Sequence, residues 1–433
     1  MQRPIATVML CLSVCGVMAG SRRAGGTEPG NWPGFLGPVP SRLSAEALPL
    51  KWSDDEHVAW RAELAGYGQS SPVVWNGRVF VTSISGSMKE TCHVTALALA
   101  TGQKLWQRDF KAAMPVRNTN YTSKAAPTPL ADPDGLIAWF ESGNLVAFDY
   151  EGRIRWQRDL VSEYGQIDTR HGLGSSLVQT NQLAIVWVER QTDPYILAVD
   201  KKTGQTRWKV PGLRVATWST PCLMSVDGRR QLVFSGGGRL AGLDPRNGKR
   251  LWTFDDVSDN TVPSPRPIAD GRLLIGASAD RDDKGGGRVA ESNGLLRVAR
   301  GEAGRYVVDF QWRCRRATSS FGSPIHHRGL VYFISRAGVL YCVDGASGKE
   351  RYAKRVGDTV WATPLPVGDR IYLAGKKGTT VVVRAGREFE ILARNQLHPR
   401  TDSNQPFVQY ALIAVERYLL IRTGSELICV GDP

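Results

Sequence analysis

After its first 20 residues, the chain has no apolar run long enough to span a membrane as a helix. It also has no run of five or six basic residues, although 55 Lys and Arg against 41 Asp and Glu give a formal net charge of +14. A basic protein favours anionic surfaces such as lipid headgroups, acidic glycans or nucleic acid. Because the positive charges are scattered, we expect a solvated surface, no transmembrane span and no specific nucleic-acid partner.

Sequence motifs for common enzyme chemistry are also missing. The chain has no P-loop and no nucleophile elbow, and its six histidines show no metal-ligand spacing. His326 and His327 are neighbours, so on a strand their side chains would point to opposite faces, and we expect them at the surface or in a turn. Ser175 and Ser176 follow "HGLG" and are interpreted as turn residues.

Cysteine usage argues against a redox or metal site. The five cysteines after residue 20 are an odd number and contain neither a C-x-x-C motif nor an adjacent pair. Cys342 in "LYCVD" and Cys429 in "LICVG" stand where related segments have alanine or glycine. We therefore expect both to be small buried hydrophobic residues.

The N-terminus has the pattern of a targeting segment. One arginine, an apolar stretch and small residues make residues 1–19 a predicted signal peptide, cleaved after Ala19. Lipid attachment at Cys15 is the alternative, but Val14 is bulkier than the residue expected before a lipidated cysteine. We expect an exported protein of the periplasm or cell envelope, with residues 20–47 as an extended segment.

A short sequence pattern recurs five times: "ALATGQKLWQRD", "DYEGRIRWQRD", "DKKTGQTRWKV", "DPRNGKRLWTF" and "DGASGKERYAK". A β-forming run precedes a turn aspartate, a glycine that allows positive φ, and an aromatic residue four positions later. This order predicts a tight hairpin whose returning strand carries an aromatic ring that docks on a neighbouring unit. The residues concerned are Asp149, Asp200, Asp244, Asp344; Gly102, Gly152, Gly204, Gly248, Gly348; Trp106, Trp156, Trp208, Trp252 and Tyr352.

The segments upstream of each hairpin add further strands, as in "SSPVVWNGRVFVTS". Repeated four-stranded antiparallel units predict an all-β fold, a β-propeller. Counting units gives eight blades, and the last lacks its fourth strand at the C-terminal end. We expect residues 57–64, with Trp60, to supply it and close the ring, so that residues 48–433 form one domain. Residues 20–40 are expected to be more dispensable than residues 48–66.

The pattern A-x-D-x-x-T-G-x-x-x-W resembles the tryptophan-docking repeat of the pyrroloquinoline-quinone-like (PQQ-like) β-propellers. That superfamily contains quinoprotein alcohol dehydrogenases and an outer-membrane assembly lipoprotein. "NWPGFLGP" (residues 31–38) also resembles the opening motif of exported propellers of planctomycete-type bacteria, with Leu36 in place of the usual arginine. The resemblance implies an exported propeller of mostly unassigned function, which we expect to be a monomer.

By the same resemblance, a quinoprotein dehydrogenase would need a flat slot for PQQ, a Ca²⁺ ion with acidic and amide ligands, a catalytic aspartate and often adjacent cysteines. No adjacent cysteines exist here. Asp280, Asp282 and Asp283 in the Asp- and Gly-rich segment 279–293 have oxygen ligands that suit Ca²⁺, but the composition favours a surface hairpin. We therefore expect no cofactor, and PQQ with Ca²⁺ is the alternative.

The loops that precede the first strand of each unit are expected to converge near the axis of the propeller. They place a set of polar and aromatic residues around one mouth, a candidate binding site: Gln69, Lys124, His171, Trp218, Phe321, Trp361 and Gln405. Alternatively, Trp218 and Trp361 plug the channel. The sequence predicts a non-catalytic module that binds or scaffolds a protein or glycan of the cell envelope. The alternatives are an outer-membrane protein assembly factor and a PQQ- and Ca²⁺-dependent quinoprotein dehydrogenase.

Overall fold

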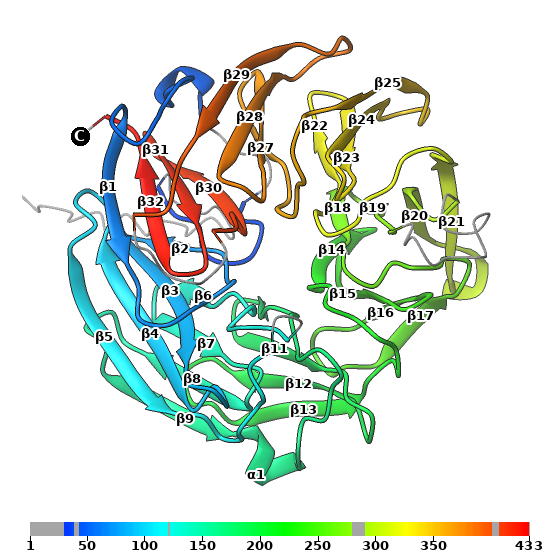
Figure 1. Cartoon of the computed structure of the whole chain (residues 1–433). Coiled ribbons are helices and arrows are strands. Elements are labelled where there is room, and N and C mark those ends of the chain that lie inside the picture. The colour runs from blue at the N-terminus through cyan, green and yellow to red at the C-terminus, as the bar shows by residue number, and fades with distance from the viewer. Residues whose placement is uncertain (1–29, 39–42, 120–121, 279–290, 401–406, 433) are drawn as a thin grey trace, which may run out of the picture.

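A computed structural model describes residues 30–38, 43–119, 122–278, 291–400 and 407–432. It contains eight four-stranded antiparallel sheets. Figure 1 shows them as blades around a common axis, with the fourth strand of each blade at the periphery. The predicted signal peptide, Gln405 and most of the Asp- and Gly-rich segment lie outside the described residues.

The first four blades follow one another along the chain. Blade 1 contains β2 (Val73–Trp75), β3 (Arg78–Ser85), β4 (Thr91–Ala98) and β5 (Lys104–Lys111). Blade 2 contains β6 (Leu130–Asp132), β7 (Gly135–Trp139), β8 (Asn144–Phe148) and β9 (Ile154–Asp159). Blade 3 contains β10 (Val178–Gln179), β11 (Leu183–Val188), β12 (Tyr195–Asp200) and β13 (Thr206–Pro211). Blade 4 contains β14 (Cys222–Val226), β15 (Arg229–Gly236), β16 (Arg239–Leu243) and β17 (Arg250–Phe254).

The remaining blades complete the ring. Blade 5 contains β18 (Arg266–Ala269), β19 (Arg272–Ile275), β20 (Gly294–Arg300) and β21 (Tyr306–Arg313). Blade 6 contains β22 (Ile325–His327), β23 (Leu330–Ile334), β24 (Val339–Asp344) and β25 (Glu350–Arg355). Blade 7 contains β26 (Leu365–Val367), β27 (Arg370–Ala374), β28 (Thr379–Arg384) and β29 (Ile391–Gln396). Blade 8 contains β30 (Ala411–Val415), β31 (Tyr418–Arg422), β32 (Glu426–Val430) and the N-terminal strand β1 (Val58–Glu63).

Helix is sparse in the described part of the chain. It is limited to α1 (Leu160–Tyr164) and to two single turns of 3₁₀-helix, η1 (Ala45–Ala47) and η2 (Glu302–Gly304). None of these is long and apolar enough to cross a bilayer.

The N-terminal strand closes the ring. β1 pairs antiparallel with β32, so that Trp60 lies opposite Cys429 and Ala62 lies opposite Leu427. This pairing gives blade 8 its fourth strand and covers the edge that β32 would otherwise expose. The predicted eight-bladed propeller, with an N-terminal closing strand, is confirmed.

The hydrophobic core lies between the blades. Each sheet packs on a neighbour at both faces, so the middle strands are apolar throughout rather than alternating. In β11, all six residues of "LAIVWV" are buried. Cys342 and Cys429 are free and completely buried, which confirms that they fill space in the core.

Five tryptophans at equivalent positions contact the hairpin of the next blade. Trp208 of blade 3 donates from its indole Nε1 to the carbonyl oxygen of Pro245 in blade 4, at 3.0 Å. Gly248 follows that carbonyl with φ near 72°, and a Cβ there would lie 2.7 Å from the Trp208 ring. Glycine is therefore required both for the turn and for the close approach of the ring. Corresponding contacts join Trp60 to Leu99 and Gly102, Trp106 to Tyr150 and Gly152, Trp156 to Lys201 and Gly204, and Trp312 to Gly345 and Gly348.

Two of the repeat positions have different partners. Trp252 packs between blades 4 and 5, but its Nε1 donates to Oε1 of Gln231 in its own blade, at 2.6 Å. The reason is that blade 5 has η2, rather than an Asp-Gly hairpin, between β20 and β21. Tyr352 packs edge-on against Phe389 of blade 7, with ring centroids 5.4 Å apart.

The repeat aspartates hold the hairpins closed. The Asp200 carboxylate accepts hydrogen bonds from the backbone N–H groups of Lys202 and Thr203, both at 3.0 Å, and from Nη2 of Arg207, at 2.8 Å. The hydrogen bond from Arg207 is the largest of the interactions that lower the pKa of Asp200 to about 2. Its ionised form therefore stabilises the folded protein.

We expect Asp200→Ala to lower the free energy of unfolding by about 1–2 kcal/mol at neutral pH, because turn hydrogen bonds are lost. The folded pKa, about 2, lies below the ordinary value of 3.8. The stabilisation is therefore complete above that value and is lost as the pH falls through about 2. Denaturant unfolding at several pH values should show the variant and the parent converging at the acid end. The exposed Asp168 provides a control, since Asp168→Ala should change stability by less than about 0.5 kcal/mol. A difference between Asp200→Ala and the parent that did not vary with pH would contradict this role.

Candidate functional site

A cavity of about 770 Å³ lies along the propeller axis, lined by the first strands of several blades and by the loops that precede them. Its volume is in the range of sites for small organic ligands. The predicted mouth residues Gln69, His171, Trp218, Phe321 and Trp361 all line it. Trp218 and Trp361 therefore belong to the wall of an open cavity.

A series of six hydrogen bonds, which we call the hydroxyl ring, joins blades 1 to 7 around this cavity. In blade after blade, a backbone N–H just before the first strand donates to a serine or threonine hydroxyl of the next blade, at 2.9–3.0 Å. In order around the axis, the ring contains Ser71, Thr128, Ser176, Thr220, Ser264, Ser323 and Thr363. Six of these seven residues are followed by a proline, whereas Ser176 is followed by leucine. This recurring Ser/Thr-Pro pair was a signal in the sequence that our prediction did not use.

The mouth residues are positioned by this hydroxyl ring. Gln69, Trp218, Phe321 and Trp361 each stand two residues before the ring hydroxyl of their own blade. In extended chain, residues two apart point to the same side. Anchoring the hydroxyl thus also directs the mouth side chain toward the axis.

Aromatic rings form an arc along one side of the mouth. Phe321 and Trp361 have centroids 5.2 Å apart, and Tyr410 follows at 6.4 Å from Trp361. Tyr67 extends the arc at 6.1 Å from Tyr410, and the two phenol oxygens are 2.8 Å apart. Burial, followed by the neighbouring Tyr410, raises the pKa of Tyr67, so its phenol stays neutral. The Lys376 ammonium lies 4.1 Å from the Trp361 ring centroid and adds positive charge to the arc.

The opposite side of the mouth holds a second aromatic pair. His171 and Trp218 have ring centroids 5.9 Å apart. The Trp218 indole Nε1 donates to the carbonyl oxygen of Gly172, at 3.0 Å, which fixes the orientation of the ring. The mouth therefore has aromatic groups on two sides.

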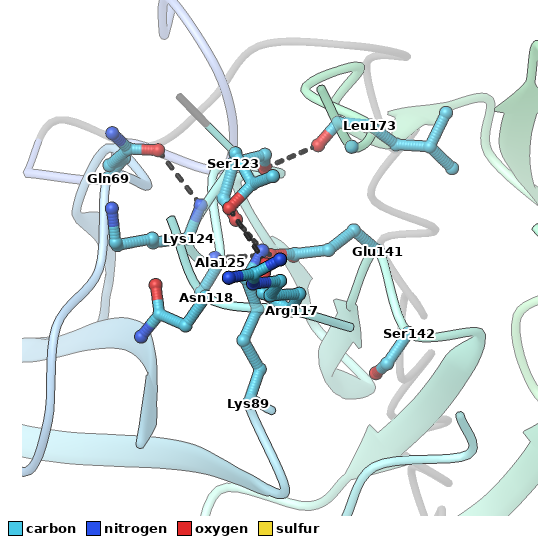
Figure 2. Close-up of polar contacts among 12 residues, drawn as sticks. Gln69, Lys89, Arg117, Asn118, Ser123, Lys124, Ala125, Glu141, Ser142 and Leu173 are labelled. Carbon is cyan, nitrogen blue, oxygen red and sulfur yellow. Dashed lines mark hydrogen bonds and ion pairs between the residues drawn. The ribbon is translucent and has the colours of Figure 1, made fainter. Parts of the chain in front are cut away.

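A buried ion pair anchors the loop between blades 1 and 2 (Figure 2). Lys89 Nζ lies 3.2 Å from Glu141 Oε1, and both side chains are only 2% exposed. The same carboxylate oxygen accepts from the backbone N–H of Ala125 at 3.0 Å, while Lys89 also donates to the Ser123 carbonyl oxygen. The Ser123 hydroxyl donates to the carbonyl oxygen of Leu173 at 2.6 Å, so this loop is tied to blade 3 as well.

Lys124 takes part in this anchoring and is not among the residues that line the cavity. Its backbone N–H donates to Oε1 of Gln69, and Gln69 N–H donates to the Lys124 carbonyl, both at 2.9 Å. Its Nζ donates to the carbonyl oxygen of Thr119 at 2.9 Å. Burial lowers the pKa of Lys124. Lys124 therefore helps to place Gln69 rather than facing a ligand itself.

His326 and His327 are not the surface or turn residues that we expected. Both are partly buried and line the cavity from β22. The Nε2 atom of His327 donates to the carbonyl oxygen of Gly368 in blade 7, at 2.7 Å. Burial lowers the pKa of both histidines. The first strands face the channel in the closed ring, which the local sequence does not reveal.

The segment "NWPGFLGP" is part of the fold. Trp32 is 5% exposed and exchanges two backbone hydrogen bonds with Val74, at 2.8 and 2.9 Å. The carbonyl oxygen of Pro33 accepts from the backbone N–H of Ala131 at 2.9 Å. Phe35 and Leu36 then line the cavity. Residues 31–36 therefore join blades 1 and 2, and the expectation that residues 20–40 are more dispensable than residues 48–66 stays a prediction.

The described residues of the cavity do not fit a Ca²⁺-bound quinone. Ca²⁺ takes six to eight oxygen ligands, mainly carboxylates and carbonyls. Within the described lining, Asp259 is the only carboxylate. No cluster of three or more His, Cys, Asp or Glu side chains that could hold a metal occurs in the part of the chain that the structure describes. Asp280, Asp282 and Asp283 lie outside that part.

Comparison with known proteins adds a family match. The family model described as outer membrane protein assembly factor BamB matches residues 46–187, 169–262 and 292–427. BamB of Bordetella pertussis is 26% identical over 316 residues, which cover 70% of this chain and 67% of that protein. BamB of Escherichia coli is 25% identical over 211 residues, 48% of each chain. The chain thus matches only about half the length of the latter relative.

Solved structures show the same fold in proteins of different activity. BamB from Moraxella catarrhalis superposes with a TM-score of 0.57 at 16% identity, covering 86% of this chain and 96% of that one. The quinohemoprotein alcohol dehydrogenase ADHIIG from Pseudomonas putida HK5 gives 0.58 at 12% identity, covering 94% of this chain and 81% of that one. At these identities, the likeness extends to the fold alone.

Proposed function

Because the chain belongs to the family of the outer membrane protein assembly factor BamB, we propose that it is an exported, non-catalytic propeller that binds envelope proteins and supports outer-membrane protein assembly. The observation that carries this proposal is the family match, which extends over most of the ring from residue 46 to residue 427. The description as an outer membrane protein assembly factor belongs to the family, and we infer the same role for this chain from its membership.

The architecture supports a binding role. Tryptophan contacts at the rim and hydroxyl contacts at the axis join neighbouring blades, so the loops are held on a rigid frame. Rigid frames that present loops are a common basis for recognition. The mouth offers aromatic and amide side chains in a concave setting, which suits binding.

The proposal is tested by removing the protein from the cell that makes it. We expect several outer-membrane proteins to become less abundant, while periplasmic proteins stay constant, when envelope fractions are compared by quantitative mass spectrometry. The parent chain, restored in trans, should recover those levels and should be found in the periplasmic or envelope fraction. Unchanged outer-membrane protein levels, or a restored chain found only in the cytoplasm, would overturn the proposal.

A quinoprotein dehydrogenase is the second candidate, because the fold resembles a quinohemoprotein dehydrogenase and the cavity has aromatic walls. The donor set described above argues against it. We expect the mature protein to show no stoichiometric uptake of PQQ with Ca²⁺ by calorimetry, and no dye reduction with alcohols or sugars. A tight one-to-one complex that is lost in Trp218→Ala or Trp361→Ala would put the dehydrogenase first.

A further inference from the structure

Arg266 places a cation in the wall of the axial cavity. It begins β18, is partly buried and lines the cavity. Its guanidinium has no hydrogen bond or ion pair with any residue in the described ranges. The titratable group that interacts with it electrostatically is the Cys222 thiol, and burial raises the pKa of that thiol to about 12, so it is uncharged at neutral pH. An uncompensated charge in such a place is costly for the fold.

The guanidinium nevertheless keeps its charge at neutral pH. Burial lowers the pKa of Arg266 to about 10, which is still well above 7. The other lining side chains of the arginine, lysine, aspartate and glutamate types are Arg336 and Asp259, and burial lowers the pKa of His326 and His327. Because cationic groups outnumber the acid, the cavity favours an anionic occupant.

Hydroxyl groups with unused protons line the same cavity as Arg266. In the hydroxyl ring, Ser264, Ser323 and Thr363 each accept an N–H, and no acceptor for their own protons occurs among the described residues. All three line the cavity, in the neighbouring blades 5, 6 and 7. Ser264 precedes Arg266 by two residues. In extended chain, their side chains point to the same side and their Cα atoms are about 6.6 Å apart. Three unused donors in the wall that also holds a cation suit a ligand rich in oxygen acceptors.

Phe321 and Trp361 stand above the same hydroxyls. Each lies two residues before the ring hydroxyl of its blade, so blades 6 and 7 each present an aromatic ring and a hydroxyl, while blade 5 presents Ser264 and Arg266. A sugar has an apolar C–H face that packs on aromatic rings and hydroxyls that accept hydrogen bonds. An aromatic acid would satisfy the rings and the arginine but leave the hydroxyl donors unused.

We propose that the axial cavity binds the end of an acidic oligosaccharide, whose carboxylate pairs with Arg266. The sugar rings lie against Phe321 and Trp361, and the ring hydroxyls of the ligand accept from Ser264, Ser323 and Thr363. A guanidinium can hold a carboxylate through two parallel hydrogen bonds. Phe35 and Leu36 also line the cavity and add apolar surface to its wall.

The test is calorimetry of the mature protein with three probes: trigalacturonate, its neutral methyl ester and indole-3-acetate. We expect trigalacturonate to bind at least about tenfold more tightly than the ester, a difference that one charged contact can supply. Arg266→Gln should remove this preference and bind the two sugars alike. Phe321→Ala should weaken both. Arg297→Gln makes the same charge change at an exposed site on β20 of the same blade and should bind as the parent does.

Thermal unfolding shows whether a variant that loses binding has lost only the site or has also lost its fold. Because Arg266 has no hydrogen bond or ion pair within the described ranges, Arg266→Gln should melt no lower than the parent. Absence of binding by trigalacturonate, or equal preference for it in Arg266→Gln and the parent, would overturn the proposal. Binding of indole-3-acetate through Arg266 without binding of either sugar would also overturn it and assign the cavity to aromatic acids.

Discussion

Removal of residues 48–66 is expected to leave a protein that self-associates and unfolds far below the parent. The deletion removes β1, which supplies the fourth strand of blade 8, and exposes the edge of β32. That strand, "ELICV", is buried along its whole length. It would then present unpaired backbone groups on an apolar strand, which invites pairing with another chain. Four large side chains that are at most 8% exposed are lost as well, each worth about 2–5 kcal/mol: Leu48, Trp52, Trp60 and Leu64.

Light scattering coupled to size exclusion and a thermal melt would measure the effect. The control is a circular permutant in which residues 57–66 follow Pro433. Since Val58 lies opposite Val430, a short hairpin can return the strand to its place, and this permutant should be monomeric. A truncated protein that stays monomeric and melts like the parent would show that β1 is not needed to close the ring.

Trp208→Ala is expected to lower the free energy of unfolding by about 3–5 kcal/mol, as is typical when a large buried aromatic side chain is removed. The ring is 8% exposed and fills the space between blades 3 and 4, against Gly248. Its loss leaves a cavity at the interface of the two blades and removes the hydrogen bond that the Pro245 carbonyl oxygen accepts. Denaturant unfolding followed by circular dichroism would measure the change.

Trp218→Ala is the matched control, because Trp218 is only partly buried at the mouth. Its loss should cost about 1 kcal/mol, mainly the hydrogen bond to the Gly172 carbonyl oxygen. Equal effects of the two substitutions, or no effect of Trp208→Ala, would mean that the tryptophan contacts do not hold the blades together.

The fold could be predicted because its determinants are local and repeated. The segment from Asp200 to Trp208 contains the turn acceptor, the positive-φ glycine and the aromatic residue within nine positions. Five copies at blade spacing leave few other architectures. The last unit has only three strands, so it needed a fourth from elsewhere in the chain. Trp60 stands in a strand-forming segment near the N-terminus, and this segment does pair with β32. None of these steps needed knowledge of distant contacts.

The site was predictable only in part, because facing the axis is a property of the closed ring. The loop positions of Trp218, Phe321 and Trp361 followed from strand order, and these residues do line the cavity. Arg266 lies within a strand, and nothing in "SPRPIAD" marks its side chain as part of the cavity wall. Tyr410 joins the mouth through contacts with Trp361 and Tyr67, which are far apart in sequence.

The same dependence on distant contacts affected the N-terminal segment. "NWPGFLGP" was recognisable as a motif, but its pairing with Val74 and Ala131 joins segments 40 to 100 residues apart. Lys124 is a further case, because its ammonium turns back to its own loop, to the Thr119 carbonyl oxygen. A loop position alone does not determine which way a long side chain points.

The hydrogen bonds that join neighbouring blades run in one direction around the ring. Trp208 at the rim and the Ser71 N–H near the axis each donate to the blade that follows in the chain. An incomplete ring therefore ends in a donor face on one side and an acceptor face on the other, and the two are complementary. Such a surface is heterologous: it either closes on itself or adds further copies head to tail. Duplication of a blade would insert a unit with the same two faces, which gives a lineage of such rings a simple route to a different number of blades.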